Sequence, residues 1–332
     1  MSSYPQGAPA GVPLAGRMYQ AIPGFEDHLE KELGPGCQWQ GPLVFAPQGA
    51  APVSAPGDMP GGSSGGVFWH LNAWLNPVKI EFDSINEAAN ALRGIQRNWA
   101  PCLFTQFRRG ALIAEKLPKV SNKKRPFPWL LPEAPMGAWT LLDARTLIAS
   151  SGCSSPFPGG VIEFDEDREG PPSRAYLKLW ESLTTLRRWP LEGERCLDAG
   201  ASPGGWTWAL ARLGAEVVAV DRSPLEPRIA ALRGVSFLKH DAFTLKPQDF
   251  GPVDWLFCDV ICYPPRLYDW IEKWLASGLC KKFVCTIKMQ GSAGGSAAAS
   301  VDFETPRRFA AIPGSTVVHL YHNKHELTWL KI

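Results

Sequence analysis

The second half of the chain alternates apolar strands with amphipathic helices. The pattern predicts helices over 173–189, 204–214, 227–234 and 266–278, and strands over 194–200, 216–221, 235–241, 253–259 and 282–288. Two further strands, 316–322 and 326–332, are joined at Asn323-Lys324. This order predicts an α/β domain with a mostly parallel sheet, covered by helices on both faces and ending in an antiparallel hairpin.

The first half of the chain has a weaker pattern of the same kind. A strand over 17–23 precedes a helix over 24–34, and a strand from Pro77 precedes a helix capped by Ser84 and running through Leu92. Strands are also expected over 139–143 and 145–150. We therefore predict a smaller N-terminal α/β domain over 17–165.

Composition marks the borders of these two domains. Tracts rich in Pro, Gly, Ala and Ser predict a disordered tail over 1–16 and a loop over 46–66. The acidic stretch 163–170 and Pro171-Pro172 place the domain boundary near residue 170, so the second domain spans 171–332. A similar small-residue tract over 291–300 predicts a mobile loop after Lys288.

Charge bears on the choice of partner only when it is considered locally. The 332 residues carry 34 Lys and Arg against 32 Asp and Glu, and this net charge of +2 gives no overall attraction to nucleic acid. Basic residues nevertheless gather between 108 and 125, just before Phe127 and Trp129. The predicted RNA-binding residues are Arg108, Arg109, Lys123, Lys124 and Arg125. A solvated surface loop is the alternative interpretation of this segment.

Other sequence features narrow the class of protein. No apolar run of about 18 residues and no signal-peptide pattern is found, so we expect a cytoplasmic protein with no membrane partner. The eight cysteines form no CxxC pair, which favours reduced thiols and no metal site. We further expect a monomer.

The turn after the strand 194–200 carries the clearest chemical signal. Small residues and a tryptophan join this strand to the next helix, as in nucleotide sites: Gly200, Ser202, Pro203, Gly204, Gly205 and Trp206. The second glycine of a dinucleotide fingerprint, which lets backbone approach a pyrophosphate, is replaced by Ser202. An NAD-dependent oxidoreductase is therefore disfavoured, although the glycines could also serve only to close the turn.

Acidic residues after the next two strands point to a different nucleotide ligand. Asp221 lies 21 residues after Gly200, where its carboxylate could accept hydrogen bonds from both hydroxyls of a ribose. Asp241 could accept from an adenine amino group. An adenosine without phosphates fits this set, so we predict that the cofactor is S-adenosylmethionine.

From Ser173 to Ile332 the chain resembles the FtsJ-like ribose 2′-O-methyltransferases. The resemblance rests on the segments SRAYLKLWE, CLDAGASPGGWTWAL, VAVDRSP, DWLFCDVICYPP, WLASGLCKKFVCTIKMQG and LYHNKHELT. It implies a Rossmann-like sheet, S-adenosylmethionine as methyl donor and 2′-O-methylation of large-subunit ribosomal RNA, free or in a pre-ribosomal particle. The N-terminal segment PGFEDHLEKEL is similar to the start of related enzymes, which implies an accessory RNA-binding domain of the THUMP type.

The resemblance also implies a catalytic tetrad at Lys178, Asp259, Lys288 and Glu326. Asp259, which also belongs to the expected cofactor site, and Lys288 end strands at the edge where ligands bind in α/β sheets. We expect Lys288, with a pKa lowered by burial and by the second lysine, to take the hydroxyl proton while Asp259 positions it. Lys178 and Glu326 would orient the hydroxyl. For Lys178 alone, a solvated lysine is an equally good interpretation.

Several other chemistries compete on the same residues. Asp259 lacks the Pro-Pro-aromatic sequence that typically follows it in amino-group methyltransferases. Cys258 or Cys262 could be a nucleophile for carbon-5 methylation, but a core thiol is favoured for Cys258. His319 and His322 are expected on opposite faces of a strand, which disfavours a metal site. A non-catalytic RNA-binding or ribosome-assembly protein that keeps the fold is the main alternative.

Overall fold

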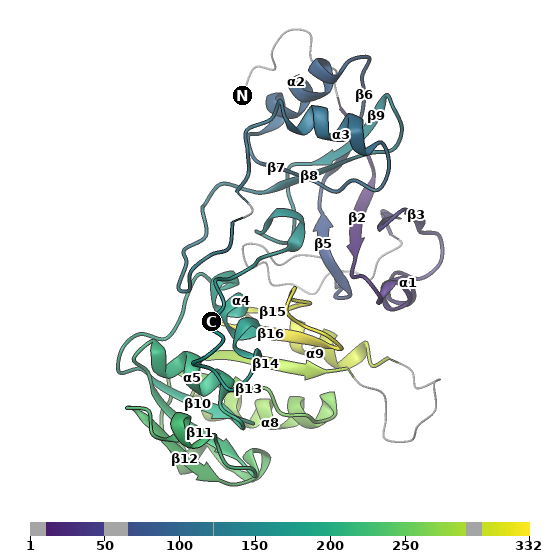
Figure 1. Ribbon diagram of the computed structural model, residues 1–332. Coiled ribbons are helices and arrows are strands. Elements are labelled where there is room, and N and C mark those ends of the chain that lie inside the picture. The colour runs from purple at the N-terminus through teal and green to yellow at the C-terminus, as the bar shows by residue number, and fades with distance from the viewer. Residues whose placement is uncertain (1–10, 50–65, 122, 290–300) are drawn as a thin grey trace. The chain divides into compact units, whose positions relative to one another are not determined.

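The computed structural model describes residues 11–49, 66–121, 123–289 and 301–332, and these form two compact units (Figure 1). The described residues up to Lys124, together with Pro132–Glu163, make the first unit. Arg125–Leu131 and Phe164–Ile332 make the second. Within the described ranges, no helix is long and apolar enough to cross a membrane.

The first unit is built from two sheets and three α-helices, counted over its described residues. One sheet has the order β1-β6-β9-β8-β7 and the other has the order β3-β4-β2-β5. Their strands are β1 (Val12–Pro13), β2 (Gly16–Ala21), β3 (Gln38–Gln40), β4 (Leu43–Pro47), β5 (His70–Trp74), β6 (Pro77–Glu81), β7 (Trp99–Pro101), β8 (Gly137–Leu141) and β9 (Thr146–Ser150). The helices are α1 (Glu26–Leu33), α2 (Ile85–Ile95), α3 (Phe107–Ala114) and the short η1 (Pro158–Gly160).

Local sequence signals explain much of this unit. The Ser84 hydroxyl accepts a hydrogen bond from the Glu87 N–H at 3.2 Å, which is the predicted N-cap of α2. Leu92 and other apolar residues of α2 pack into a core with Ile80 and Trp139 of the larger sheet.

Two predictions about the irregular tracts need correction. Residues 12 and 13 form strand β1, which pairs with β6, so the disordered tail predicted over 1–16 is wrong for this part. The backbone of β6 satisfies the hydrogen bonds of this segment, although the segment contains few apolar side chains to bury. Likewise β4 extends to Pro47, within the loop predicted over 46–66. Residues 1–10, 50–65 and 290–300, and with them most of the predicted tail and loops, lie outside the described residues.

The second unit is a seven-stranded sheet with flanking helices, counted over its described residues. The strand order is β12-β11-β10-β13-β14-β16-β15, parallel except for the pairs made by β16. The strands are β10 (Arg195–Ala199), β11 (Glu216–Asp221), β12 (Val235–Lys239), β13 (Trp255–Cys258), β14 (Lys282–Lys288), β15 (Ser315–Val318) and β16 (Glu326–Lys331). The helices are α4 (Tyr176–Thr185), α5 (Gly205–Arg212), α6 (Pro227–Ala230), η2 (Ala242–Thr244), α7 (Pro247–Phe250), α8 (Pro264–Ser277) and α9 (Glu304–Ala310). The predicted α/β class with its C-terminal antiparallel hairpin is confirmed.

The order of the strands creates a crevice at one edge of this sheet. From β10 the chain adds β11 and β12 on one side, and then returns to add β13 and β14 on the other side. Because such crossovers are right-handed, α5 and α8 cover opposite faces, as Figure 1 shows. Ligands of open α/β sheets bind where the order reverses, beyond the carboxyl ends of the strands. Here that point lies between β10 and β13.

The C-terminal hairpin is shorter than the pattern predicts. β15 ends at Val318, and residues 319–325 form the connection to β16, so His319 and His322 lie outside the strand. The prediction that strand alternation separates these two rings therefore fails. β16 pairs with β14 in antiparallel register, with Lys288 opposite Glu326.

One segment belongs to a different unit from the one expected. The prediction assigned all of 17–165 to the N-terminal domain, but Arg125–Leu131 groups with the second unit. Phe127 stacks on Trp180 of α4 at 4.9 Å between ring centroids, and Arg125 pairs with Phe164 through a β-bridge. These contacts between residues distant in sequence are not visible in local periodicity.

The packing of β16 generates a first prediction. Trp329 is fully buried, and its ring lies 5.3 Å from that of Phe283 on β14 and 5.0 Å from that of Phe309 on α9. We expect Trp329→Ala to lower the opening free energy of β14–β16 by about 3 kcal/mol or more, because it leaves a cavity. Hydrogen exchange of these strands measures the loss, and β8 and β9 serve as the internal control. Unchanged protection of β14 would contradict this account of the packing.

Candidate functional site

Four charged residues from four elements meet at the carboxyl edge of the second sheet. Lys178 lies on α4, Asp259 directly follows β13, Lys288 ends β14, and Glu326 begins β16. Because β16 runs antiparallel to β14, its first residue lies at the edge where β14 ends. The topology thus brings together the four residues to which the resemblance assigned the tetrad. We call them the charged quartet.

Close ion pairs join the members of the charged quartet. The Lys178 Nζ lies 3.0 Å from Asp259 Oδ1 and 2.8 Å from Glu326 Oε1. The Lys288 Nζ lies 2.6 Å from the same Asp259 oxygen and 3.6 Å from Glu326 Oε2. Each lysine therefore faces both carboxylates, and each carboxylate faces both lysines.

Burial makes these pairings strong. Lys178 is only 4% exposed, which excludes the solvated lysine that its place on the polar side of the helix allowed. Burial alone would raise the pKa of Asp259 and of Glu326, but Lys178 and Lys288 outweigh it, and both pKa values are lowered. Both carboxylates are therefore ionised at neutral pH.

The protonation of Lys288 differs from the expectation. Burial does lower its pKa, but the negative charges of Asp259 and Glu326 outweigh burial, and the pKa is raised. The expected repulsion by the second lysine does not dominate, because Lys178 is itself paired to the same two carboxylates. In this state Lys288 is an ammonium group.

A buried carboxylate on α4 fixes the chain next to Glu326. Glu181, 2% exposed and one turn after Lys178, accepts hydrogen bonds from the N–H groups of Tyr321 and His322 at 2.8 and 3.0 Å. The His322 ring Nδ1 lies 2.6 Å from the same carboxylate. These bonds tie the connection before β16 to the helix that carries Lys178. Local sequence does not single out Glu181, because it lies on the same polar side of α4 as Lys178, where an exposed acid is the ordinary expectation.

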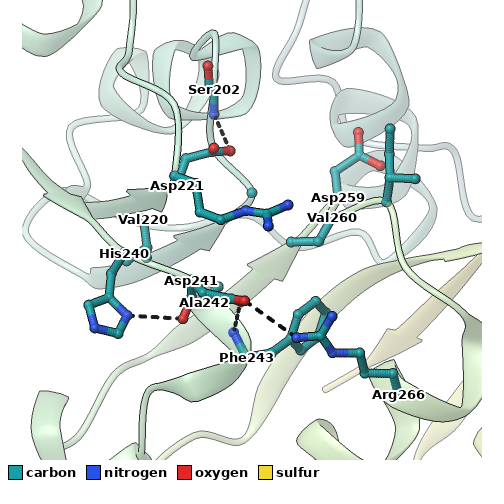
Figure 2. A pocket seen from close by; sticks show the side chains of 13 residues that line it. Ser202, Val220, Asp221, His240, Asp241, Ala242, Phe243, Asp259, Val260 and Arg266 are labelled. Atoms are coloured by element: carbon teal, nitrogen blue, oxygen red, sulfur yellow. Dashed lines mark hydrogen bonds and ion pairs between the residues drawn. The ribbon is translucent and has the colours of Figure 1, made fainter.

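A cavity of about 250 Å³ lies beside the charged quartet (Figure 2). Of the residues predicted to bind cofactor, it is lined by Gly200, Ser202, Asp221, Asp241 and Asp259. In Figure 2, Ser202 and Asp221 lie on one side of the opening, and Asp259 and Val260 lie on the other. Asp259 therefore belongs to both the cavity and the charged quartet.

The other residues of the glycine turn do not line the cavity. Gly204 has φ +118° and lies against Ile229, where a Cβ would approach a side-chain carbon to 2.7 Å. A Cβ on Gly205 would meet the Ser173 hydroxyl at 2.6 Å, and the buried Trp206 indole donates to the Ala175 carbonyl at 2.9 Å. In this structure Pro203, Gly204, Gly205 and Trp206 shape the start of α5 rather than the cavity wall.

The geometry of the turn also bears on the kind of ligand. Gly200 has φ +80°, and a Cβ there would lie 2.6 Å from a methyl group of Val260, so glycine allows the ends of β10 and β13 to approach closely. The Ser202 N–H donates to Asp221 Oδ2 at 3.1 Å, and its hydroxyl donates to the Pro224 carbonyl. Because this N–H is engaged inside the protein, the turn does not offer it to a pyrophosphate.

Asp221 and Asp241 are held in place by backbone donors. Asp221 also accepts from the Ser223 N–H at 2.8 Å, and Asp241 accepts from the Phe243 N–H at 3.0 Å. Arg266 lies 3.4 Å from Asp241 and 4.7 Å from the Phe243 ring centroid. The two carboxylates, fixed at the ends of neighbouring strands, are thus presented to the cavity as acceptors.

Asp198 is a further acid that the sequence analysis missed. It lies on β10, 1% exposed, and its Oδ2 accepts from the Thr207 hydroxyl at 2.6 Å. Among the described residues, Oδ1 has no hydrogen-bond partner. Burial raises the pKa of Asp198 to about 7, against the smaller opposing effect of the Thr207 hydrogen bond. A charge inside an otherwise apolar strand was the available signal.

The cysteines and histidines that suggested other chemistries have structural surroundings. Burial raises the pKa of Cys258 well above its usual value, and raises that of Cys262 to about 11, so neither thiol is activated as a nucleophile. His319 is buried with its Nε2 3.0 Å from the Lys324 carbonyl. In the described ranges, no three His, Cys, Asp or Glu side chains group as metal ligands do.

The predicted RNA-binding residues fall on different parts of the structure. Arg108 and Arg109 lie on α3 of the first unit, where Arg109 packs over the Phe82 ring. Lys123 and Lys124 are exposed at the end of the same unit. Arg125 belongs to the second unit and lies 4.6 Å from the Trp129 ring centroid. The single continuous segment of the sequence is therefore divided between the two units.

Comparison with known proteins supports the resemblance predicted for the second unit. Residues 171–309 match the FtsJ-like methyltransferase family, so the predicted resemblance is confirmed for this part of the chain. The chain is 35% identical over 182 residues to ribosomal RNA large subunit methyltransferase M of Azoarcus sp. (strain BH72), covering 52% of this chain and 49% of that protein. It is 32% identical over 216 residues to the protein of that name from Xanthomonas campestris pv. campestris (strain B100), covering 61% of this chain and 57% of that protein.

These matches are partial in length. The chain spans about half the length of the curated relatives it matches. Among solved structures, the fibrillarin pre-rRNA processing protein of Methanococcus jannaschii aligns with a TM-score of 0.32 at 18% identity, covering 43% of this chain and 67% of that chain.

The buried Asp198 generates a prediction about pH. Its folded pKa of about 7 is raised above the unfolded value of about 3.9, so between these values the folded state holds the extra proton. Its contribution to stability is therefore greatest at low pH and declines as pH rises toward 7, by up to about 1.4 kcal/mol per pH unit. We expect the neutral Asp198→Asn variant to gain stability relative to wild type over this window. Urea unfolding at pH 5, 6, 7 and 8 measures the difference, and a pH-independent difference would refute the assignment.

Proposed function

We propose that the protein is an S-adenosylmethionine-dependent methyltransferase that modifies a ribose 2′-hydroxyl in large-subunit ribosomal RNA. The observation that carries the proposal is the shared position of Asp259, which lines the cavity and pairs with both lysines of the charged quartet. A methyl donor in the cavity and a hydroxyl at the charged quartet would meet at this carboxylate. The names of the relatives support ribosomal RNA as the substrate.

The cavity residues fit an adenosine-containing donor. Asp221 would accept from the ribose hydroxyls and Asp241 from the adenine amino group, while Gly200 and Ser202 would form the adjacent wall. When bound, S-adenosylmethionine supplies a methyl group already activated by a positively charged sulfur. The protein therefore has to orient the acceptor oxygen and remove its proton, and alignment contributes much of the rate.

The charged quartet can perform both tasks. Lys178, buried and paired to Asp259 and Glu326, is fixed as a donor that orients the hydroxyl oxygen. Lys288 lies at the end of its strand, more exposed than Lys178, and is the side chain we assign as proton acceptor. The new bond joins the methyl carbon to the 2′-oxygen, the bond from that carbon to sulfur breaks, and the proton passes to Lys288 and then to solvent.

Lys288 has to be neutral before it can accept this proton. Its raised pKa means that the side chain carries its own proton in the present structure. An additional positive charge beside Asp259 would oppose the ammonium form and lower the pKa of Lys288. We infer that Lys288 becomes a base only when the methyl donor is bound, so that the protein alone does not hold an active base.

The first unit and the segment that follows Lys124 in the sequence would hold the RNA. Arg108, Arg109, Lys123, Lys124 and Arg125 are proposed to contact phosphates, and Trp129 to contact bases. A THUMP-type role for the first unit, and a pre-ribosomal particle as the physiological partner, belong to the same proposal. A ribosome-assembly protein without catalysis is the alternative. The observation against it is that all four positions of the charged quartet carry the residue types that the resemblance implies for catalysis.

Methyl transfer provides the direct test. Purified protein, labelled S-adenosylmethionine and an unmodified transcript of bacterial large-subunit ribosomal RNA should give label in alkali-resistant linkages, because a 2′-O-methyl group blocks alkaline cleavage. Lys288→Ala should lower the rate about 10²- to 10⁴-fold, as removal of a general base does. Exposed Lys281, just before the same strand, provides the control Lys281→Ala, which should retain the wild-type rate. Label on bases, or a fully active Lys288→Ala protein, would reject the proposal.

RNA binding by the basic segment can be tested by salt dependence. Joint replacement of Lys123, Lys124 and Arg125 by Ala should weaken RNA binding and reduce the slope of log affinity against log salt by about one for each phosphate that is no longer neutralised. Filter binding over a range of KCl concentrations measures both effects. Lys273→Ala, at an exposed position on α8, is the control. An unaltered slope in the triple variant would show that these residues do not touch phosphates.

A further inference from the structure

Two large apolar side chains stand exposed on the loop that carries Asp259. Ile261 is 81% exposed and Tyr263 is 48% exposed, although neighbouring residues of β13 and α8 are buried. Scattered exposed apolar residues are normal on protein surfaces. These two differ because Ile261 lines the cavity and lies two residues from Asp259, whose carboxylate belongs to the charged quartet.

The loop that presents these side chains is held at both ends. At its start, the Asp259 N–H donates to the Ala199 carbonyl at 3.2 Å. At its end, the Tyr263 carbonyl accepts from the N–H groups of Arg266 and Leu267 in the first turn of α8. Pro264 restricts the backbone of Tyr263 further. The two side chains thus form a preorganised apolar rim.

A nucleotide whose 2′-hydroxyl is held at the charged quartet needs an apolar surface nearby for its base. The 2′-oxygen and the base are attached to neighbouring carbons of one ribose, so a hydroxyl held at the charged quartet places its base close by. The faces of a base are flat and apolar, and they stack on aromatic or aliphatic side chains. A charged surface alone would leave these faces in water and the ribose free to rotate.

We propose that Ile261 and Tyr263 form a binding subsite for the base of the nucleotide that is methylated. This inference rests on the proposed function and names how its substrate is seated. Apolar packing recognises the face of a base and not its edge, so the subsite accepts any of the four bases. It fixes the ribose against Asp259 and Lys288, and choice among nucleotides has to come from other contacts.

Kinetics with RNA and donor varied separately test the subsite. Ile261→Ala and Tyr263→Ala should each raise the KM for the large-subunit transcript about tenfold, within the range for removal of one side chain that stacks on a base. The dissociation constant for S-adenosylmethionine should stay at the wild-type value. Tyr263→Phe keeps the ring and should behave as wild type.

A matched control lies at the opposite edge of the sheet. Leu191 is 63% exposed and precedes the amino end of β10, so Leu191→Ala removes a similar apolar surface away from the cavity. Its KM for RNA should equal that of wild type. Once the modified nucleotide is mapped, an oligonucleotide with an abasic ribose at that position should erase the difference between Tyr263→Ala and wild type.

The outcomes separate this inference from the function on which it rests. A wild-type protein that transfers no methyl group to ribose overturns both. A wild-type protein that is active, with variants of unchanged KM, overturns the subsite alone. A weakened affinity for S-adenosylmethionine in Ile261→Ala would instead assign the rim to the wall of the donor cavity, and would also overturn the subsite.

Discussion

The structure of the second unit depends on burying two lysines and two carboxylates together. A single buried charge is very costly, and it is tolerated only when opposite charges and hydrogen bonds offset the loss of water. Here Lys178 and Lys288 each face Asp259 and Glu326, so no member is buried alone. The register between β14 and β16, and the bonds from Glu181 to residues 321 and 322, keep these four charges within reach of one another.

The same arrangement connects the charged quartet to the ligand crevice. Asp259 follows β13 at the point where the strand order reverses, so one carboxylate lies in both the ligand crevice and the charged quartet. Its two lysines keep it ionised, and it in turn helps to keep Lys288 protonated. In the proposed reaction, Lys288 loses its own proton only when another positive charge reaches Asp259. Binding of the donor is thereby coupled to the formation of a neutral lysine that can act as a base.

The sequence predicted the parts that local pattern and topology determine. Alternating strands and helices indicated the sheet, Ser84 indicated a helix cap, and the resemblance located the charged quartet. Contacts between distant residues could not be predicted in this way. The burial of Lys178 depends on partners 81 and 148 residues away, and Phe127 joins the second unit through ring contacts with Phe164, Trp180 and Trp189. The predicted direction of the Lys288 pKa was wrong because the negative charges of two carboxylates, Asp259 and Glu326, outweigh the effect of burial.

A double-mutant cycle tests most directly whether the charged quartet acts as one electrostatic unit. The free energy of unfolding at pH 7 would be compared for wild type, Lys178→Met, Glu326→Gln and the double variant. Each single change leaves an unbalanced buried charge, whereas the double change removes one charge of each sign. We predict that the double variant loses less stability than the sum of the single losses, by about 1–3 kcal/mol. Losses that add to within about 0.5 kcal/mol would contradict the account.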